Sequence, residues 1–395
     1  MLDSFNDTST AFRYKNNEEL NRANFLFSFM ASPLLTGLGI KAVKFSLALH
    51  LPVQWLLKKT IFRQFCGGET LEETSALTNK LGQYSVSTIL DYGIEGKDDE
   101  ATFDQAVPEF LKAIDFAAGH RHIPFISLKI TGFARFALLE KLNNGARANY
   151  DEQAEWDRVY TRIDSICDHA AAKNVMVLID AEETWIINPC NELTEAMMEK
   201  YNKDKVIVFN TYQLYCSGTL HFLEVSIVKA KRLGYLLGAK LVRGAYMEKE
   251  RLRAAKMGYP DPIQPDKAAT DRDFDQAVEL CLNNLDALAV FIGSHNEDSN
   301  LKSIAHMERQ GIAHDDSRVY FSQLLGMSDH ISFNLAAEQY NVSKYMPYGP
   351  VEDVVPYLMR RAQENTSVAG QTSRELALIK TEKNRRKAAR SLCRS

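Results

Sequence analysis

The 395-residue chain is nearly neutral, and it has neither closely spaced cysteines nor a long uninterrupted apolar segment. A formal net charge of −4 at pH 7 gives no indication of nucleic-acid binding. Its six cysteines are scattered, and acidic residues at Asp3, Asp7, Glu18 and Glu19 precede the first apolar run. That pattern argues against a secretory signal or an acid-poor transit peptide. We therefore expect reduced thiols in a reducing compartment.

Residues 25–57 are strongly apolar, but charged residues and prolines interrupt them. The interruptions are Pro33, Lys41, Lys44, His50 and Pro52, whereas a membrane-spanning helix needs about 20 consecutive apolar residues. We expect helices that pack against the main domain, with contact at a membrane interface as the alternative.

A dinucleotide-binding fingerprint is present only as a partial match. Residues 37–42 read Gly-x-Gly-x-x-Ala, but Pro33 lies just upstream. The acidic residue expected about 20 positions further on is missing. Because the fingerprint requires a preceding strand, we reject this match as a cofactor site.

From residue 86 onward, short apolar runs alternate with longer amphipathic segments. Continuous apolarity is typical of strands buried on both faces, and the intervening segments look helical, as at 106–118 and 152–173. Eight such units predict a (β/α)8 barrel, distorted by extra helices between Arg243 and Leu288. The runs are Val86–Leu90, Phe125–Ile130, Val175–Ile179, Val206–Phe209, Ala239–Val242, Ala289–Ile292, Val319–Phe321 and Ser343–Met346.

We predict three regions along the chain: a helical extension at 1–83 that packs on the barrel or contacts a membrane, the barrel at 84–367, and a basic tail at 368–395. From Arg374 to Arg394 the tail has eight lysines and arginines against two glutamates. It is suited to contact with anionic lipid or to a solvated terminal helix.

Polar residues follow the predicted strands at the ends where barrel enzymes bind ligands. A single polar residue there is as often a helix cap or a paired charge, but their convergence indicates a site. The strand ends carry Lys129, Asp180, Asn210, Lys240, Arg243, Gly244, Ala245, Tyr246, Ser294, His295, Asn296, Gln323, Leu324 and Tyr345.

The segment 345–361 combines a predicted strand, a tight turn and a helix that we expect to open at Pro356. Tyr357, Arg360 and Arg361 then share one helical face. Two guanidinium groups beside a phenol suit a carboxylate, which arginine binds bidentately. A solvated basic face is the alternative.

Three other classes of barrel protein compete on the residues alone. A metal-dependent hydrolase usually has His-x-His at the end of its first strand, but His120 and His122 precede the second strand, and His295 alone makes no metal site. A Schiff-base aldolase would use Lys129 or Lys240 as an amine nucleophile. The third alternative is a non-catalytic sensor of an amino acid.

Five ordered motifs resemble the proline dehydrogenase family, in its stand-alone mitochondrial-type branch, over about residues 84–367. They are Asp180–Glu183, Phe209–Gln213, Lys240–Tyr246, Gly293–Asn296, and Tyr345–Pro350 with Tyr357–Asn365. The resemblance implies FAD-dependent oxidation of L-proline to Δ1-pyrroline-5-carboxylate, with electrons passed to a membrane quinone. It also implies a cytoplasmic location with peripheral contact at the inner face of the membrane, or at the mitochondrial inner membrane in a eukaryote.

The resemblance further implies roles for single residues. Arg360, Arg361 and Lys129 would hold the proline carboxylate, Asp180 would orient Arg361 or a tyrosine, and the ring would be enclosed by Tyr246, Leu324, Tyr345 and Tyr357. FAD would be contacted by Asn210, Lys240, Arg243, Gly244, Ala245, Ser294, His295, Asn296, Gln323 and Glu364. Asn210, Lys240 and Ser322 depart from the bacterial bifunctional pattern. Hydroxyproline-oxidising relatives tend to have a smaller residue where Tyr345 stands, so Tyr345 favours proline, with hydroxyproline as the alternative.

Overall fold

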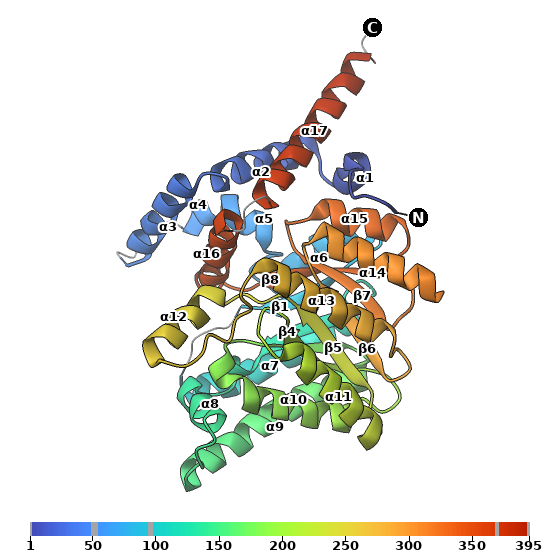
Figure 1. Cartoon of the computed structure of the whole chain (residues 1–395). Coiled ribbons are helices and arrows are strands. Elements are labelled where there is room, and N and C mark those ends of the chain that lie inside the picture. Colours follow the sequence, from blue (N-terminus) through green and yellow to red (C-terminus); the bar gives the residue numbers. More distant parts are fainter. Residues whose placement is uncertain (1, 49–53, 94–97, 368–370, 393–395) are drawn as a thin grey trace. The chain divides into compact units, whose positions relative to one another are not determined.

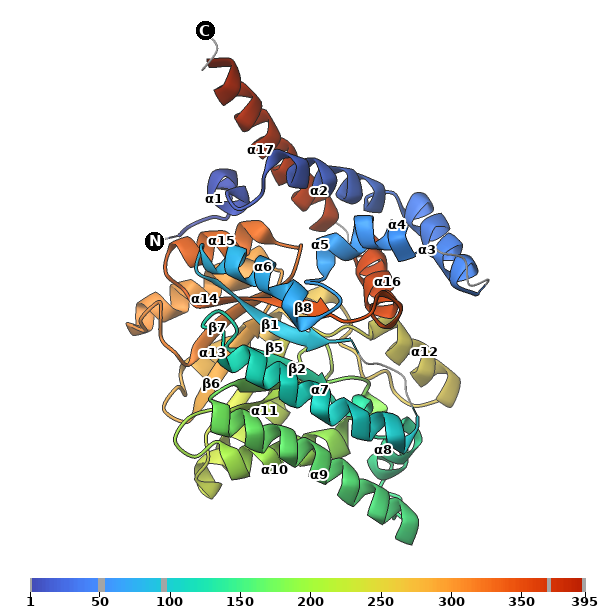
Figure 2. The ribbon, with the colours of Figure 1, turned by 180° about the vertical axis from the view of Figure 1, so that it is seen from behind.

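A computed structural model describes residues 2–48, 54–93, 98–367 and 371–392 (Figures 1 and 2). Eight strands close into a parallel barrel in chain order, which confirms the predicted fold. The ring of Phe125 on β2 packs against the rings of Phe209, Phe291 and Tyr320. The strands are β1 (Val86–Tyr92), β2 (Phe125–Lys129), β3 (Met176–Asp180), β4 (Val208–Gln213), β5 (Leu237–Val242), β6 (Leu288–Gly293), β7 (Val319–Leu324) and β8 (Val342–Tyr348).

The helices that connect the strands have clear sequence signals at their ends. Helix α9 (Tyr150–Lys173) begins with a capping box of Asn149 and Glu152 and ends at Asn174, whose φ of 58° is left-handed. Two helices lie between β5 and β6, as the long spacing predicts: α12 (Met247–Met257) and α13 (Lys267–Leu282). The others are α7 (Glu100–Ala118), α8 (Phe136–Asn143), α10 (Ile187–Tyr201), α11 (Thr219–Leu233), α14 (Glu297–Gln310), α15 (Asp329–Ala337) and α16 (Val351–Ser367).

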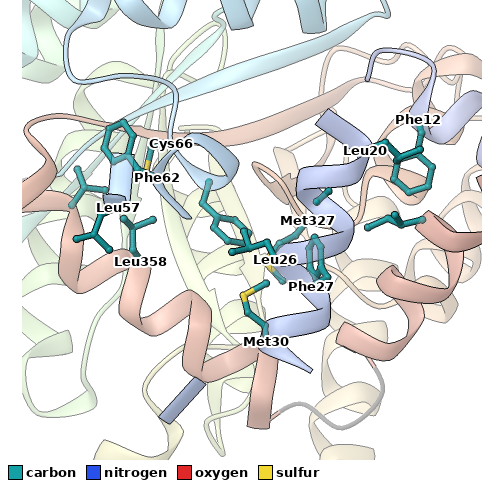
Figure 3. Close-up of a cluster of buried hydrophobic side chains, with 14 of the residues drawn as sticks. Phe12, Leu20, Leu26, Phe27, Met30, Leu57, Phe62, Cys66, Met327 and Leu358 are labelled. Carbon is teal, nitrogen blue, oxygen red and sulfur yellow. The ribbon is translucent and has the colours of Figure 1, made fainter. Parts of the chain in front are cut away.

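The chain forms two compact units, Thr88–Ser322 and Met1–Ser87 with Gln323–Ser395. Within the second unit, apolar side chains of the N-terminal helices pack against α16 and α17 (Gln371–Leu392), as Figure 3 shows for Leu57 beside Leu358. The N-terminal helices are α1 (Thr8–Phe12), α2 (Asn17–Met30), α3 (Pro33–Ala48), α4 (Gln54–Leu57), α5 (Arg63–Phe65) and α6 (Leu71–Gly82).

A buried ionic hub centred on Asp329 joins distant parts of this unit. Its carboxylate lies 2.9 Å from the ammonium of Lys15 and 3.0 Å from that of Lys344, and it accepts a hydrogen bond from Tyr14 at 2.8 Å. Burial alone would raise the pKa of Asp329, but the two lysines outweigh it and hold that pKa well below its usual range. The ionised carboxylate of Asp329 on α15 therefore links the N-terminal segment to β8.

The expected helix start at Pro356 is wrong. Helix α16 begins at Val351, directly after Pro350, whose carbonyl accepts from the amide of Val354 at 3.2 Å. Pro356 therefore lies inside the helix. A proline within a helix removes one backbone hydrogen bond, but the i, i+3 and i+4 relation of Tyr357, Arg360 and Arg361 is unchanged.

Two other expectations concern the N-terminal segment. Gly37 and Gly39 lie within α3, which follows α2 and no strand, so the rejection of the dinucleotide match is confirmed. Within the described part of the chain, no helix combines the length and the apolarity that crossing a membrane requires.

Candidate active site

The carboxyl ends of β2, β3 and β5 bring three of the predicted site residues together. Lys129 and Asp180 are paired in the strand register, and the Lys240 ammonium lies 2.5 Å from the Asp180 carboxylate. Lys129 lies 3.8 Å from both Asp180 and Asp91. All four side chains are largely buried, so these strand ends form a compact ionic cluster inside the barrel unit.

This cluster bears on the Schiff-base alternative. An amine nucleophile must be uncharged, whereas a carboxylate at ion-pair distance stabilises the ammonium form. Lys240 is paired with Asp180, and Lys129 lies between two carboxylates. Both amines are therefore engaged by carboxylates, whereas the nucleophile of an aldolase must be available to attack a carbonyl carbon.

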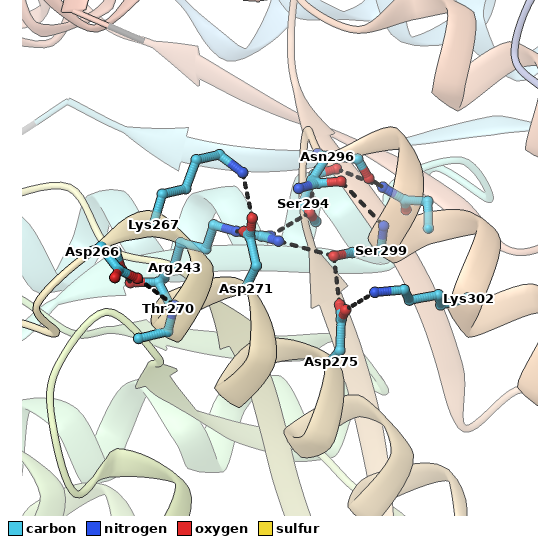
Figure 4. Close-up of polar contacts among 12 residues, drawn as sticks. Arg243, Asp266, Lys267, Thr270, Asp271, Asp275, Ser294, Asn296, Ser299 and Lys302 are labelled. Atoms are coloured by element: carbon cyan, nitrogen blue, oxygen red, sulfur yellow. Dashed lines mark hydrogen bonds and ion pairs between the residues drawn. The ribbon is translucent and has the colours of Figure 1, made fainter. Parts of the chain in front are cut away.

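Arg243, directly after β5, is held by side chains from α13, α14 and the end of β6 (Figure 4). Its guanidinium donates to Asp271 at 2.7 Å, to Ser294 at 2.9 Å and to Ser299 at 2.9 Å. Its central carbon lies 4.3 Å from the centre of the Phe274 ring. Asn296 caps α14 by accepting from the amide of Ser299, and its neighbour His295 is half-buried.

The turn after Arg243 is shaped by Gly244. With a φ of 134° and the ring of Tyr215 only 2.3 Å from the position of a Cβ, no other residue fits without displacement. Gly244 and Ala245 are exposed, and Tyr246 is half-buried just before α12. The exposed backbone of Gly244 and Ala245 therefore lies directly after the hydrogen-bonded guanidinium of Arg243.

Asn210 and Gln323 are engaged with helices around the barrel. The Asn210 amide donates to Asn191 on α10 at 3.0 Å, and Gln323 accepts from Ser332 on α15 at 2.6 Å. Asn210 therefore does not join the ionic cluster at the ends of β2, β3 and β5. Its flavin contact stays a prediction.

The other unit contains the Tyr345–Arg361 segment. Tyr345 is buried on β8, and on α16 the guanidinium carbon of Arg361 lies 5.1 Å from the centre of the Tyr357 ring. Arg361 is buried, whereas Arg360, Tyr357 and Leu324 are half-buried. Of the predicted common face of Tyr357, Arg360 and Arg361, the contact between Tyr357 and Arg361 is confirmed. The side chain of Glu364 lies outside the described residues.

Sequence reasoning missed the residues that hold the β5 loop in place. Besides Asp271 and Ser299, these include Glu250 on α12, whose carboxylate accepts from the backbone amide and the hydroxyl of Thr184, both at 2.7 Å. Burial raises the pKa of Glu250. An acidic residue inside a charged helical segment gives no sequence signal that separates such a contact from a solvated face. Among the described residues, no three acidic, histidine or cysteine side chains form a metal-binding group.

A closed (β/α)8 barrel with charged side chains at its strand ends is the architecture of a barrel enzyme. A family model described as proline dehydrogenase matches residues 75–374. The chain therefore belongs to the proline dehydrogenase family, and it is an oxidoreductase.

Individual relatives differ in substrate name and in coverage. Hydroxyproline dehydrogenase from Xenopus laevis is 33% identical over 97% of this chain and 90% of its own length. Mitochondrial proline dehydrogenase 1 is 42% identical in Drosophila melanogaster, over 60% of this chain and 36% of that protein. In Homo sapiens it is 41% identical, over 61% of this chain and 41% of that protein.

A solved structure supports the fold. Proline utilization A from Bdellovibrio bacteriovorus, inactivated by N-propargylglycine, matches with a TM-score of 0.71 at 18% identity. The match covers 92% of this chain and 37% of that one.

Proposed function

We propose that the protein oxidises L-proline to Δ1-pyrroline-5-carboxylate, with FAD as its bound cofactor and a membrane quinone as the final electron acceptor. The observation that carries the substrate class is the buried Arg361 stacked on Tyr357, one helical turn apart on α16. Membership of the proline dehydrogenase family supports the reaction. The names of two relatives include the word mitochondrial. We propose the inner mitochondrial membrane in a eukaryote, or the inner face of the cytoplasmic membrane in a bacterium, as the place of action.

The residues after β5 and β6 fit a flavin chemically. Arg243, Ser294 and Lys240 are hydrogen-bond donors in partly or fully buried positions, and Gly244 and Ala245 are exposed beside them. When bound, FAD supplies the acceptor for a hydride. We propose that it is held by Asn210, Lys240, Arg243, Gly244, Ala245, Ser294, His295, Asn296 and Gln323, with Glu364 as a further contact.

The protein's own part in the reaction is orientation. In the proposed site, Arg360, Arg361 and Lys129 bind the carboxylate, which fixes the position of the pyrrolidine ring. Asp180 orients Arg361 or a tyrosine, and Tyr246, Leu324, Tyr345 and Tyr357 enclose the ring and exclude water. The hydride leaves C5, the ring nitrogen loses its proton to solvent, and the C5–N double bond forms.

Hydroxyproline is the second candidate substrate. The observation in its favour is the match to hydroxyproline dehydrogenase along nearly the whole chain. The buried phenol of Tyr345 favours proline, because a ring hydroxyl would need additional space beside it.

Delivery of electrons to a quinone requires approach to a lipid surface. The helices α2, α3 and α4 expose large apolar side chains at Phe25, Leu34, Leu38 and Trp55, and the ammonium of Lys59 lies 4.0 Å from the Trp55 ring centre. Aromatic and cationic residues together are typical of interfacial anchors. We propose that this surface contacts the membrane.

The test of the proposed function is the visible spectrum of the purified protein under anaerobic conditions. We expect a flavin spectrum that L-proline bleaches, with slower bleaching by trans-4-hydroxy-L-proline. A colourless protein that binds no added FAD would exclude the proposal. A flavin that only hydroxyproline bleaches would replace the first substrate with the second.

A further inference from the structure

We propose that Asp271, together with Asp275 acting through Ser299, positions the guanidinium of Arg243 for contact with the cofactor. Asp271 and Asp275 lie one turn apart on α13, and Ser299 lies on α14, so neither acidic residue belongs to a strand end. The inference rests on the proposed FAD site, and it adds residues that this site does not include.

The contacts form a continuous chain of hydrogen bonds (Figure 4). Asp271 accepts from the Nε of Arg243 at 2.7 Å, and Ser299 accepts from one terminal nitrogen at 2.9 Å. The Ser299 hydroxyl in turn donates to Asp275 at 2.5 Å. Because a hydroxyl that donates to a carboxylate keeps its lone pairs for an incoming N–H, Asp275 fixes Ser299 as the acceptor of Arg243.

These contacts leave a defined part of Arg243 for a ligand. A guanidinium has five N–H donors in one plane. Among the described residues, Asp271, Ser294 and Ser299 take three of them, and Phe274 covers one face of the plane. One N–H on each terminal nitrogen remains, together with the opposite face. The network therefore sets the direction in which the arginine presents its remaining donors.

The charges around Arg243 explain why carboxylates are used. Lys267 pairs with Asp271, and Lys302 pairs with Asp275, so each acidic residue is bound by two groups. Burial raises the pKa of Asp271, but its bonds to Lys267 and Arg243 outweigh that effect, and the net pKa is lowered. Asp271 is thus ionised at neutral pH, and its bond to Arg243 is charge-assisted, which makes it stronger and more directional than a neutral one.

The test compares substitutions of the network with a substitution on the same helix outside it. Asp271→Ala removes the acceptor, Asp271→Asn keeps an acceptor without the charge, and Ser299→Ala removes the second contact. Asp273→Asn is the matched control, since the Asp273 carboxylate accepts from Gln264 and has no contact with Arg243 among the described residues. Arg243→Met, alone and combined with Asp271→Ala, gives a double-mutant cycle. The readouts are the dissociation constant of FAD from the apoprotein and the midpoint potential of the bound flavin.

We expect Arg243→Met to weaken FAD binding at least about tenfold, and Asp271→Ala to reproduce most of that loss with a potential shift of the same sign. Asp271→Ala should add less than about twofold in the Arg243→Met background, and Asp273→Asn should stay within about twofold of the unmodified protein. Asp271→Asn and Ser299→Ala should have intermediate effects on FAD binding and on the flavin potential. If circular dichroism shows that Asp271→Ala is unfolded, these two variants replace it in the test.

Three results would overturn the inference. The first is an Asp271→Ala variant that matches Asp273→Asn in both readouts, and the second is full additivity in the double variant. The third is an Arg243→Met variant that binds FAD normally, because the positioned group then has no role. A protein that holds no flavin would instead overturn the proposed function, which separates the two failures.

Discussion

Lys240 on β5 donates to the carboxylate of Asp180, the last residue of β3, over 2.5 Å. The same carboxylate lies 3.8 Å from Lys129 at the end of β2. One acidic residue therefore serves two buried cations, so the two partners of the short ion pair are not equivalent.

We predict that Asp180→Asn destabilises the protein more than Lys240→Met. Asp180→Asn leaves two buried ammonium groups without this partner, for which about 3–5 kcal/mol is expected, whereas after Lys240→Met the carboxylate still has Lys129. The measurement is the free energy of unfolding in urea at neutral pH. Lys231→Met, which breaks an exposed ion pair with Asp286, is the control and should cost less than about 1 kcal/mol. Equal losses for the two site variants would contradict this reading of the cluster.

The Asp329 hub predicts a dependence of stability on pH. Because the pKa of Asp329 is lower in the folded than in the unfolded protein, its stabilisation is present above the unfolded pKa of about 4 and is lost as the pH falls through the folded pKa. Asp329→Asn should therefore lower the free energy of unfolding by about 3–5 kcal/mol at pH 7, with a smaller difference at pH 3.

The measurement for Asp329 is urea unfolding at several pH values. Asp204→Asn, at an exposed position, is the control and should change stability little at any pH. A difference between Asp329→Asn and the unmodified protein that stays constant from pH 7 to pH 3 would show that the charge of Asp329 is not the source of its contribution.

Arg361 should govern substrate affinity. We expect Arg361→Met to raise KM for proline by at least about thirtyfold, since the loss of a buried charge partner costs about 2–5 kcal/mol. Arg361→Lys keeps the charge without the planar fork and should lie between the two. Steady-state kinetics and the flavin content are the measurements, with exposed Lys380→Met on α17 as control. An unchanged KM in a flavin-containing Arg361→Met variant would remove Arg361 from the carboxylate site.

The apolar surface of α2, α3 and α4 should bind lipid. Trp55, 65% exposed, should contribute about tenfold to the partition onto vesicles of phosphatidylcholine and phosphatidylglycerol when it is compared with Trp55→Ser. Leu252→Ser on α12 removes a side chain that is 72% exposed and serves as the matched control. If both variants sediment with vesicles like the unmodified protein, this surface is not the membrane contact.

The sequence predicted the barrel because its strands are buried on both faces. Continuous apolar runs are typical of such strands. Because the carboxyl ends of parallel strands lie at one end of a barrel, the runs also predict that Lys129, Asp180 and Lys240 lie at the same end. The helix at Val351–Ser367 was misplaced at its start because the preference of proline for the first turn was applied to Pro356 rather than to the Gly349-Pro350 turn.

The partners of Arg243 could not be predicted in the same way. Asp271 and Asp275 belong to a helical segment rich in charge, and periodicity does not distinguish a buried contact from a solvated one. Asp329 presents the same difficulty at longer range, since its partner Lys15 comes from the other end of the chain. These contacts depend on how the helices and strands pack together, and the hydrophobic periodicity of a single segment does not predict that packing.

Tyr345 should determine the preference between proline and hydroxyproline. Its side chain is buried on β8. Hydroxyproline-oxidising relatives are expected to have a smaller side chain at this position. Tyr345→Ser should raise kcat/KM for trans-4-hydroxy-L-proline relative to that for L-proline by about tenfold, because it opens space for the ring hydroxyl and supplies a polar partner. Tyr345→Phe is the matched control, since it keeps the ring and should leave the ratio nearly unchanged. If Tyr345→Ser leaves the ratio of the two kcat/KM values unchanged, the phenol does not obstruct a hydroxyl on C4 of the substrate ring. If the ratio changes equally in Tyr345→Ser and Tyr345→Phe, the preference comes from the Tyr345 hydroxyl rather than from the bulk of its ring.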